Sequence, residues 1–201
     1  EILVKKLKIK QIIIGYDHRF GRDREASVED LKKFSLDYMF TVNEIPAQEI
    51  NSIAISSTKI RDAILNGEIE KCNKFLGRNF TLTGKVVYGD GLGEKINFPT
   101  ANIEIKEFYK IIPKNGVYLV KTTLNSNIYF GMMNIGIRPT IGGGNKSLEI
   151  HFFNFKDNLY DKTISIEIIN KIRDEIKFAS IDKLKIQLKK DEQFCLQLIN
   201  N

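Results

Sequence analysis

The sequence predicts a mixed α+β chain in which a partial α/β segment precedes an antiparallel β-domain that ends in a helix. Over residues 1–76 helical and strand patterns alternate, as in α/β folds. Residues 80–169 hold about six short runs rich in β-branched and aromatic residues, separated by Gly, Asn and Pro, which is typical of a barrel or a sandwich. Residues 180–199 return to a helical period.

The first half contains helix signals at both ends of its periodic stretches. Its predicted elements are a helix over 1–9, a buried strand over 11–17, a helix over 27–40, a strand over 40–45, and two helices over 55–67 and 68–77. Ser27 is a plausible N-cap with Asp30 three residues later, close to the spacing of a capping box. Ser56 or Ser57 begins the later helix, and Gly67 ends it.

The second half is predicted to hold strands over 80–88, 101–105, 116–124, 127–136, 147–155 and 163–169, followed by a helix over 180–199. We place the domain boundary near residue 76, which gives domains over 1–76 and 77–201. The first domain supplies only two or three strands, whereas a doubly wound sheet needs several. Because the chain also begins within a helical pattern and without Met, we expect it to be a fragment.

Composition excludes several classes of protein. The chain has 201 residues, 42% hydrophobic and 28% charged, which is ordinary for a globular protein. No apolar run approaches the roughly 18 residues of a membrane span, and no signal peptide is visible. Cys72 and Cys195 lack metal-ligand or disulfide spacing, so we expect reduced core thiols and a cytoplasmic protein. The net charge of +6 fits either scattered lysines or a basic face for a polyphosphate or nucleic acid.

A glycine-rich turn, GDGLGEK, occupies residues 89–95. Gly89, Gly91 and Gly93 allow the backbone N–H groups to approach a ligand closely, which suits phosphate oxygens. Lys85 and Lys95 add positive charge on either side. The turn is not a Walker A motif, because no GK[ST] follows, and a plain β-turn is the alternative interpretation.

The segment FPTAN, residues 98–102, follows that turn. Thr100 and Asn102 are two residues apart, so on an extended strand their side chains face the same side. A hydroxyl and an amide oxygen are hard ligands suited to Mg²⁺ on nucleotide phosphates. Pro99 restricts the backbone before them.

A carboxylate also lies within an apolar strand, SLEIHFFNF, over 147–155. Alternation places Glu149, His151 and Phe153 on one face and Ile150 and Phe152 on the other. Glu149 is therefore either exposed at a sheet edge or has a chemical task.

Five motifs, GDGLGEKINFPTAN, NGVYLV, MNIGIRPT, LEIHFFNF and LYDKTISIEIINKIRDEIKF, resemble the riboflavin kinase module in order and spacing over residues 78–194. Upstream, IIIGYDHRFGRDRE and ISSTKIRDAI resemble the later part of the FMN adenylyltransferase module. The chain is thus similar to the C-terminal two-thirds of a bacterial bifunctional riboflavin kinase/FAD synthetase. The resemblance implies a six-stranded antiparallel barrel with a C-terminal helix and a kinase that converts riboflavin and MgATP to FMN and ADP.

The resemblance also implies roles for individual residues of the kinase module. They are Glu149 as catalytic base, Gly89, Gly91, Gly93, Lys95 and Thr100 in ATP binding, Thr100 and Asn102 as Mg²⁺ ligands, and Arg173 near the flavin. Two positions depart from the family pattern. Asn97 replaces a usual glycine, which is tolerable because Asn visits the left-handed region. Glu94 replaces a usual basic residue and puts one phosphate contact in doubt.

The upstream resemblance implies that Tyr16, Asp17, Ser56, Ser57, Thr58 and Arg61 are a remnant of the adenylyltransferase site. That family carries an HxGH motif, but His18 and His151 do not form one. We therefore expect no FAD synthesis by this chain. The alternatives are a basic barrel that binds single-stranded nucleic acid and an inactive scaffold fragment. We favour the kinase, with no nucleic-acid or membrane partner.

Overall fold

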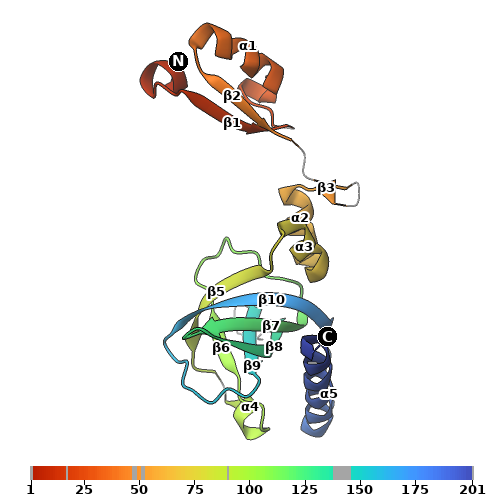
Figure 1. Cartoon of the computed structure of the whole chain (residues 1–201). Helices are drawn as coiled ribbons and strands as arrows, with labels where there is room; N and C mark the ends of the chain where they lie inside the picture. Colours follow the sequence, from red (N-terminus) through yellow and green to blue (C-terminus); the bar gives the residue numbers. More distant parts are fainter. Residues whose placement is uncertain are drawn as a thin grey trace. The chain divides into compact units, whose positions relative to one another are not determined.

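The computed structural model describes residues 2–16, 18–46, 49–50, 53–89, 91–137 and 146–200, with side chains for all of these except 49, 50 and 53. The chain divides into two compact units, Glu1–Ile55 and Ser56–Asn201, which Figure 1 colours along the sequence. Each unit is described by itself below.

The first unit contains a parallel pair of strands joined by a helix. Strands β1 (Gln11–Gly15) and β2 (Thr41–Ile45) pair in parallel, and α1 (Val28–Tyr38) connects them. The predicted capping box is confirmed, since the Asp30 backbone N–H donates to the Ser27 hydroxyl and the Ser27 backbone N–H donates to the Asp30 carboxylate. A short antiparallel pair, β3 (Glu49–Ile50) and β4 (Ile53–Ala54), ends the unit.

The helix predicted over residues 1–9 is wrong in length and type. The structure has only a π-helical turn, Ile2–Lys6, none of whose residues is buried. Most helical stability comes from packing an apolar face, and this segment packs none of its residues deeply. Lys8 adopts a left-handed backbone conformation just beyond the turn, with φ of 49°.

The second unit opens with helices α2 (Ser57–Asn66) and α3 (Ile69–Leu76). As predicted, the Ser56 side chain caps α2 and Gly67 ends it, with φ of 75°. The amide of Asn73 on α3 donates to the carbonyls of Ile168 and Ile169 at 3.0 and 3.1 Å and accepts from the backbone N–H of Phe80 at 2.8 Å. These bonds connect α3 to the β-domain. Both α2 and α3 belong to the same compact unit as the β-domain, although the predicted domain boundary lies near residue 76.

Six antiparallel strands then form a closed barrel, in the order β10-β5-β6-β9-β8-β7. Their bounds are β5 (Phe80–Val87), β6 (Ala101–Glu104), β7 (Gly116–Leu124), β8 (Asn127–Ile137), β9 (Lys146–Phe152) and β10 (Thr163–Asp174). A short helix, α4 (Leu92–Lys95), lies between β5 and β6, and α5 (Ile181–Asn200) follows β10. The predicted barrel and C-terminal helix are confirmed.

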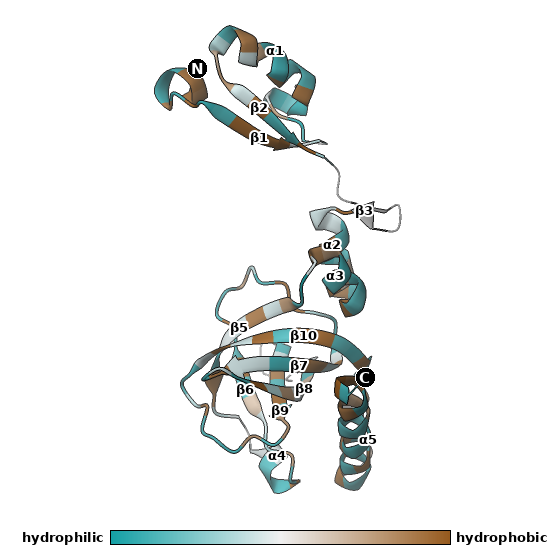
Figure 2. Cartoon of the chain, in the orientation of Figure 1, coloured by the Kyte–Doolittle hydropathy of each residue, from teal (hydrophilic) through white to brown (hydrophobic). Residues whose placement is uncertain are grey.

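Apolar layers lie on both faces of the barrel wall. The barrel interior is filled by one cluster that includes Leu82, Ile135, Ile150 and Ile166. A second cluster, including Phe98, Met132, Phe153 and Cys195, lies between the outer surface of the barrel and α5. Figure 2 shows apolar and polar residues alternating around α5, as expected for a helix with one buried side. The second layer matters for function, because it borders the candidate site.

Both cysteines, Cys72 and Cys195, are buried and free, as predicted. Burial raises the pKa of the Cys195 thiol to about 12, and the nearby charge of Asp191 acts in the same direction. No helix among the described residues is long and apolar enough to cross a membrane.

Candidate functional site

A cavity of about 230 Å³ opens on the outer surface of the barrel, beside α5. Its apolar walls come from α4 and the following loop, from β7 and β8, and from α5; they include Leu92, Ile96, Phe98, Val117, Met132, Leu184 and Leu188. Its polar side chains are Thr100, Asn134, Glu149, His151, Arg173 and Glu175. A largely apolar cavity with a few convergent polar groups is the usual form of a small-molecule site.

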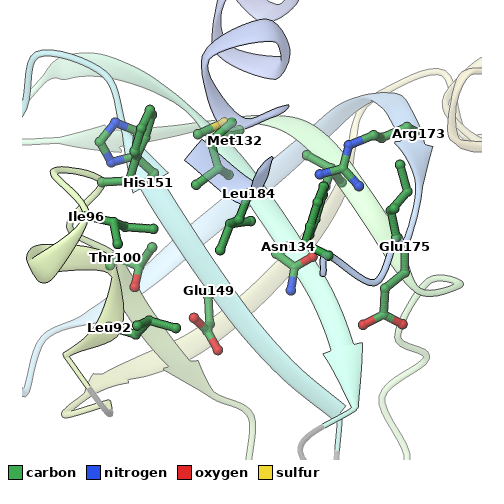
Figure 3. A pocket seen from close by; sticks show the side chains of 16 residues that line it. Leu92, Ile96, Thr100, Met132, Asn134, Glu149, His151, Arg173, Glu175 and Leu184 are labelled. Atoms are coloured by element: carbon green, nitrogen blue, oxygen red, sulfur yellow. The ribbon is translucent and has the colours of Figure 1, made fainter. Parts of the chain in front are cut away.

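The alternation of β9 explains how Glu149 reaches this cavity. Leu148 and Ile150 belong to the barrel interior, so Glu149 and His151 point to the outside. The predicted sharing of one face by Glu149 and His151 is thus confirmed. Glu149 is paired with Asn102 of β6 on one side and with Asn134 of β8 on the other. Figure 3 shows Glu149 between Thr100 and Asn134.

The glycine-rich turn packs closely against FPTAN. A Cβ atom added at Gly89 would lie 2.1 Å from the amide nitrogen of Asn102. One added at Gly93 would lie 2.3 Å from the Phe98 carbonyl oxygen and 3.1 Å from Thr100 Oγ1. A side chain at Gly89 would displace Asn102, and one at Gly93 would collide with the Phe98 backbone beside Thr100, so both positions favour glycine.

The donor set fits a magnesium ion that is shared with a nucleotide. Thr100 and Asn102 offer a hydroxyl and an amide oxygen, with the Glu149 carboxylate on the neighbouring strand. Among the described residues, no group of three or more His, Cys, Asp or Glu side chains forms a metal site. Mg²⁺ suits such a sparse set of oxygen ligands, because it keeps several waters and takes phosphate oxygens as further ligands.

The two lysines beside the turn, Lys85 and Lys95, have different surroundings. Lys85 forms an ion pair with Asp161 at 2.7 Å, and this hydrogen bond and charge raise the pKa of the lysine. Lys95 lies on α4 and is exposed. Asn97 has φ of 64°, so the expected left-handed conformation is confirmed. Lys95 is therefore the better placed of the two lysines to meet a ligand.

Another cavity, of about 470 Å³, also has Thr100 in its wall. Its other lining residues are Val86, Glu94, Pro99, Ala101, Ile150, Phe152 and the segment 155–160. At its edge the rings of Tyr88 and Tyr160 stack, with centroids 3.9 Å apart and planes inclined by 18°. Thr100 thus contributes to the walls of two cavities.

Arg173 lies at the wall of the first cavity but is held firmly by other groups. Its Nε donates to both carboxylate oxygens of Asp191 at 3.0 Å, and its Nη2 donates to Oδ2 at 2.8 Å. Its Nη1 donates to the Asp174 carbonyl, and Gln187 donates to Asp191 at 2.8 Å. Phe178 lies beneath the guanidinium, 5.9 Å from ring centroid to Cζ. The predicted contact of Arg173 with the flavin stays a prediction.

Comparison with known proteins agrees with this geometry. A family model described as riboflavin kinase matches residues 76–199, which include all residues that line both cavities. The chain belongs to the riboflavin kinase family. A second family model, FAD synthetase, matches residues 1–59.

Relatives of this riboflavin kinase family member cover its whole length. The bifunctional riboflavin kinase/FMN adenylyltransferase of Buchnera aphidicola subsp. Schizaphis graminum is 44% identical over 99% of the chain and 64% of the relative. That of Haemophilus influenzae is 38% identical over 100% of the chain and 65% of the relative. The chain therefore spans somewhat less than two thirds of these proteins.

A solved structure from Streptococcus pneumoniae, described as a macrolide-efflux protein, has a TM-score of 0.80 and 36% identity to this chain. The matched region comprises 90% of this chain and 59% of the chain of that structure. The kinase interpretation from the sequence is supported by the family, and the nucleic-acid-binding alternative is not favoured.

The residues assigned to adenylyl transfer are divided between the two units. Tyr16 follows β1 in the first unit, where its backbone N–H donates to the Ile45 carbonyl. Ser56, Thr58 and Arg61 belong to the second unit, where Ser56 caps α2. Ser57 begins α2. Asp17, which is also assigned to this site by the resemblance, lies outside the described residues. Their role in this family member stays a prediction.

Several residues of the site were not identified by sequence reasoning. Alternation had placed His151 beside Glu149, but no task was assigned to it. Asn134 and Glu175 also line the cavity, and Asn134 lies in a motif that the resemblance had already marked. Asp191 gave no usable signal, because an acidic residue on an amphipathic helix is normally exposed.

Proposed function

We propose that this chain is a riboflavin kinase that transfers the terminal phosphoryl group of ATP to the ribityl 5′-hydroxyl of riboflavin. The observation that carries the proposal is Thr100, which lies in the walls of both cavities. A phosphoryl transfer needs a donor and an acceptor that meet at one point. The shared threonine marks such a point, with Glu149 on the acceptor side.

The first cavity suits the flavin. Its apolar walls match an aromatic ring system, and Glu149 provides a carboxylate at its polar end. Glu149 accepts the proton of the 5′-hydroxyl while that oxygen forms a bond to the terminal phosphorus. The bond between this phosphorus and the bridging oxygen breaks, its electrons remain on that oxygen, and ADP and FMN result.

The second cavity and the glycine-rich turn suit the nucleotide. Gly89 and Gly93 let the turn pack against Asn102 and Thr100, a glycine-rich turn suits phosphate oxygens, and Lys95 adds charge. Thr100 and Asn102 would hold Mg²⁺, which when bound neutralises charge on the phosphates. The exposed stack of Tyr88 and Tyr160 offers an aromatic surface at the edge of this cavity.

The test is to incubate the purified chain with riboflavin, ATP and Mg²⁺ and to separate the flavins by chromatography. We expect FMN that depends on enzyme, ATP and Mg²⁺. Absence of FMN at high enzyme concentration, from a chain shown to be folded by circular dichroism, would contradict the proposal. A cytoplasmic location and the lack of FAD synthesis stay predictions beside it.

A further inference from the structure

We infer that His151 is a positioning residue, whose imidazole Nδ1–H donates to the carbonyl oxygen of Pro99 and thereby fixes Thr100. The two atoms are 2.9 Å apart. The inference rests on the proposed function, since it assigns Thr100 a place at the phosphates. It concerns the chain's own residues and can be tested without turnover.

The backbone explains why a side chain is needed here. Among the described residues, strands β6 and β9 pair at two positions, Ala101 with Ile150 and Asn102 with Glu149. Pro99 has no N–H, so it cannot extend the ladder as a donor. Its carbonyl belongs to the same planar peptide group as the Thr100 nitrogen. A hydrogen bond to that carbonyl therefore holds the peptide plane from which the Thr100 side chain projects.

The imidazole is itself held in place by two aromatic rings. Phe98 lies edge-on to it with centroids 5.1 Å apart, and Phe153 does so at 6.1 Å. Both phenylalanines are buried in the layer between barrel and α5. Their packing limits rotation of the His151 ring. The hydrogen bond from this ring to the Pro99 carbonyl is therefore held in one orientation.

Strand β9 thus carries one residue for each substrate of the proposed reaction, the flavin and the nucleotide. Glu149 and His151 are two residues apart on β9 and face the same cavity. Glu149 is placed to accept the proton, and His151 sets the backbone that carries Thr100. A fixed spacing along one rigid strand keeps the two groups in register, as a positioned site requires.

The chemistry fixes the tautomer. A carbonyl oxygen only accepts hydrogen bonds, so Nδ1 of His151 must carry the hydrogen. Nitrogen–proton correlation spectra of the chain with ¹⁵N-labelled histidine distinguish the neutral tautomers of its two histidines. We expect the His151 signals, assigned by their loss in a variant, to show the Nδ1–H tautomer. The Nε2–H tautomer would overturn the inference.

Two variants distinguish the effect of the His151 hydrogen-bond donor from the effect of its aromatic ring. His151→Phe keeps an aromatic ring between Phe98 and Phe153 but has no donor, whereas His151→Asn keeps an N–H donor near the Nδ1 position. We expect calorimetry to show MgADP binding weakened about fivefold to tenfold in His151→Phe, the usual weight of one hydrogen bond. His151→Asn should stay within about threefold of the parent chain.

The outcomes are distinct. A parent chain that makes no FMN defeats the proposed function, whatever His151 does. An active parent whose His151→Phe variant binds MgADP as tightly as before, or whose two variants lose equal affinity, defeats the inference. Should His151→Phe fail to fold by circular dichroism, the tautomer of the unaltered chain and the His151→Asn affinity decide the matter.

Discussion

Glu149 lies on β9 and Thr100 directly before the neighbouring strand β6, yet their functional groups suit different tasks. Glu149 presents a carboxylate to the apolar cavity, and Thr100 presents a hydroxyl to the turn formed by Gly93. In the proposed reaction the first moves a proton and the second helps to hold the metal and phosphates. Single substitutions can separate these roles, because each group has a close isostere.

Glu149→Gln keeps the shape of the side chain and removes its basic function. We expect turnover to fall by about 10²–10⁴-fold, the usual weight of general-base catalysis. MgADP affinity should persist, since the carboxylate acts on the acceptor hydroxyl. Steady-state rates and calorimetry measure the two effects. Unchanged turnover would place the base elsewhere.

Thr100→Val keeps the β-branched shape that a strand accepts and deletes the ligand oxygen. We expect it to weaken Mg²⁺-dependent binding of ADP by about tenfold or more, the weight of one polar contact to a charged group. Calorimetry with and without Mg²⁺ measures this. Equal affinity of variant and parent in the presence of Mg²⁺ would contradict the assignment. Binding lost in Glu149→Gln but kept in Thr100→Val would reverse the two roles.

At the scale of elements, one buried ion pair connects β10 to α5. Asp191 is only 3% exposed, and Arg173 and Gln187 satisfy its oxygens. The pair fixes the helix that closes one wall of the cavity. Removing one partner of such a pair leaves an uncompensated charge in a buried place.

Asp191→Asn tests this connection. We expect the free energy of unfolding to fall by about 3 kcal/mol, because the Arg173 guanidinium loses its counter-charge. The matched control is Glu68→Gln, which breaks the exposed pair with Lys71 at 2.7 Å and should cost at most about 1 kcal/mol. Urea unfolding followed by circular dichroism gives both values. Equal effects of the two substitutions would mean that the buried pair contributes no more than an exposed one.

The same scale shows what sequence patterns can and cannot predict. The six barrel strands and the caps of α1 and α2 were predictable, because alternation and capping are local, whereas the short pair β3 and β4 was not predicted. Barrel closure was not predictable from the strands themselves, since six strands at this spacing suit a sandwich equally well. Closure depends on pairs such as Gly116 with Asp174, far apart in sequence. The bond from His151 to Pro99 and the pair of Arg173 with Asp191 are likewise contacts between distant segments, which no local period encodes.

At the scale of the whole molecule, the boundary between the two compact units falls after Ile55 in the sequence, whereas the change of sequence pattern lies near residue 76. Helices α2 and α3 fall between these positions. Ile69 of α3 is fully buried in the barrel's interior cluster, and Asn73 bonds to β10. The barrel therefore depends on residues that precede its first strand.

Two truncated chains measure that dependence. Residues 56–201 should unfold cooperatively in urea. Residues 77–201 should be less stable by at least about 2–5 kcal/mol, the usual cost of losing one buried isoleucine side chain. Circular dichroism is the suitable probe, because the chain has no Trp. Equal stability of the two would show that the boundary near residue 76 is also the boundary of the folding unit.

Strand β9 faces two environments on alternate residues, with Leu148, Ile150 and Phe152 inside the barrel and Glu149 and His151 outside. The number of residues in this strand is therefore constrained by its two environments. Inserting or deleting one residue before position 149 would turn every later side chain to the opposite face. The carboxylate would then enter the apolar interior while an isoleucine took its place in the cavity. The number of residues along this strand is therefore as restrictive as their identity.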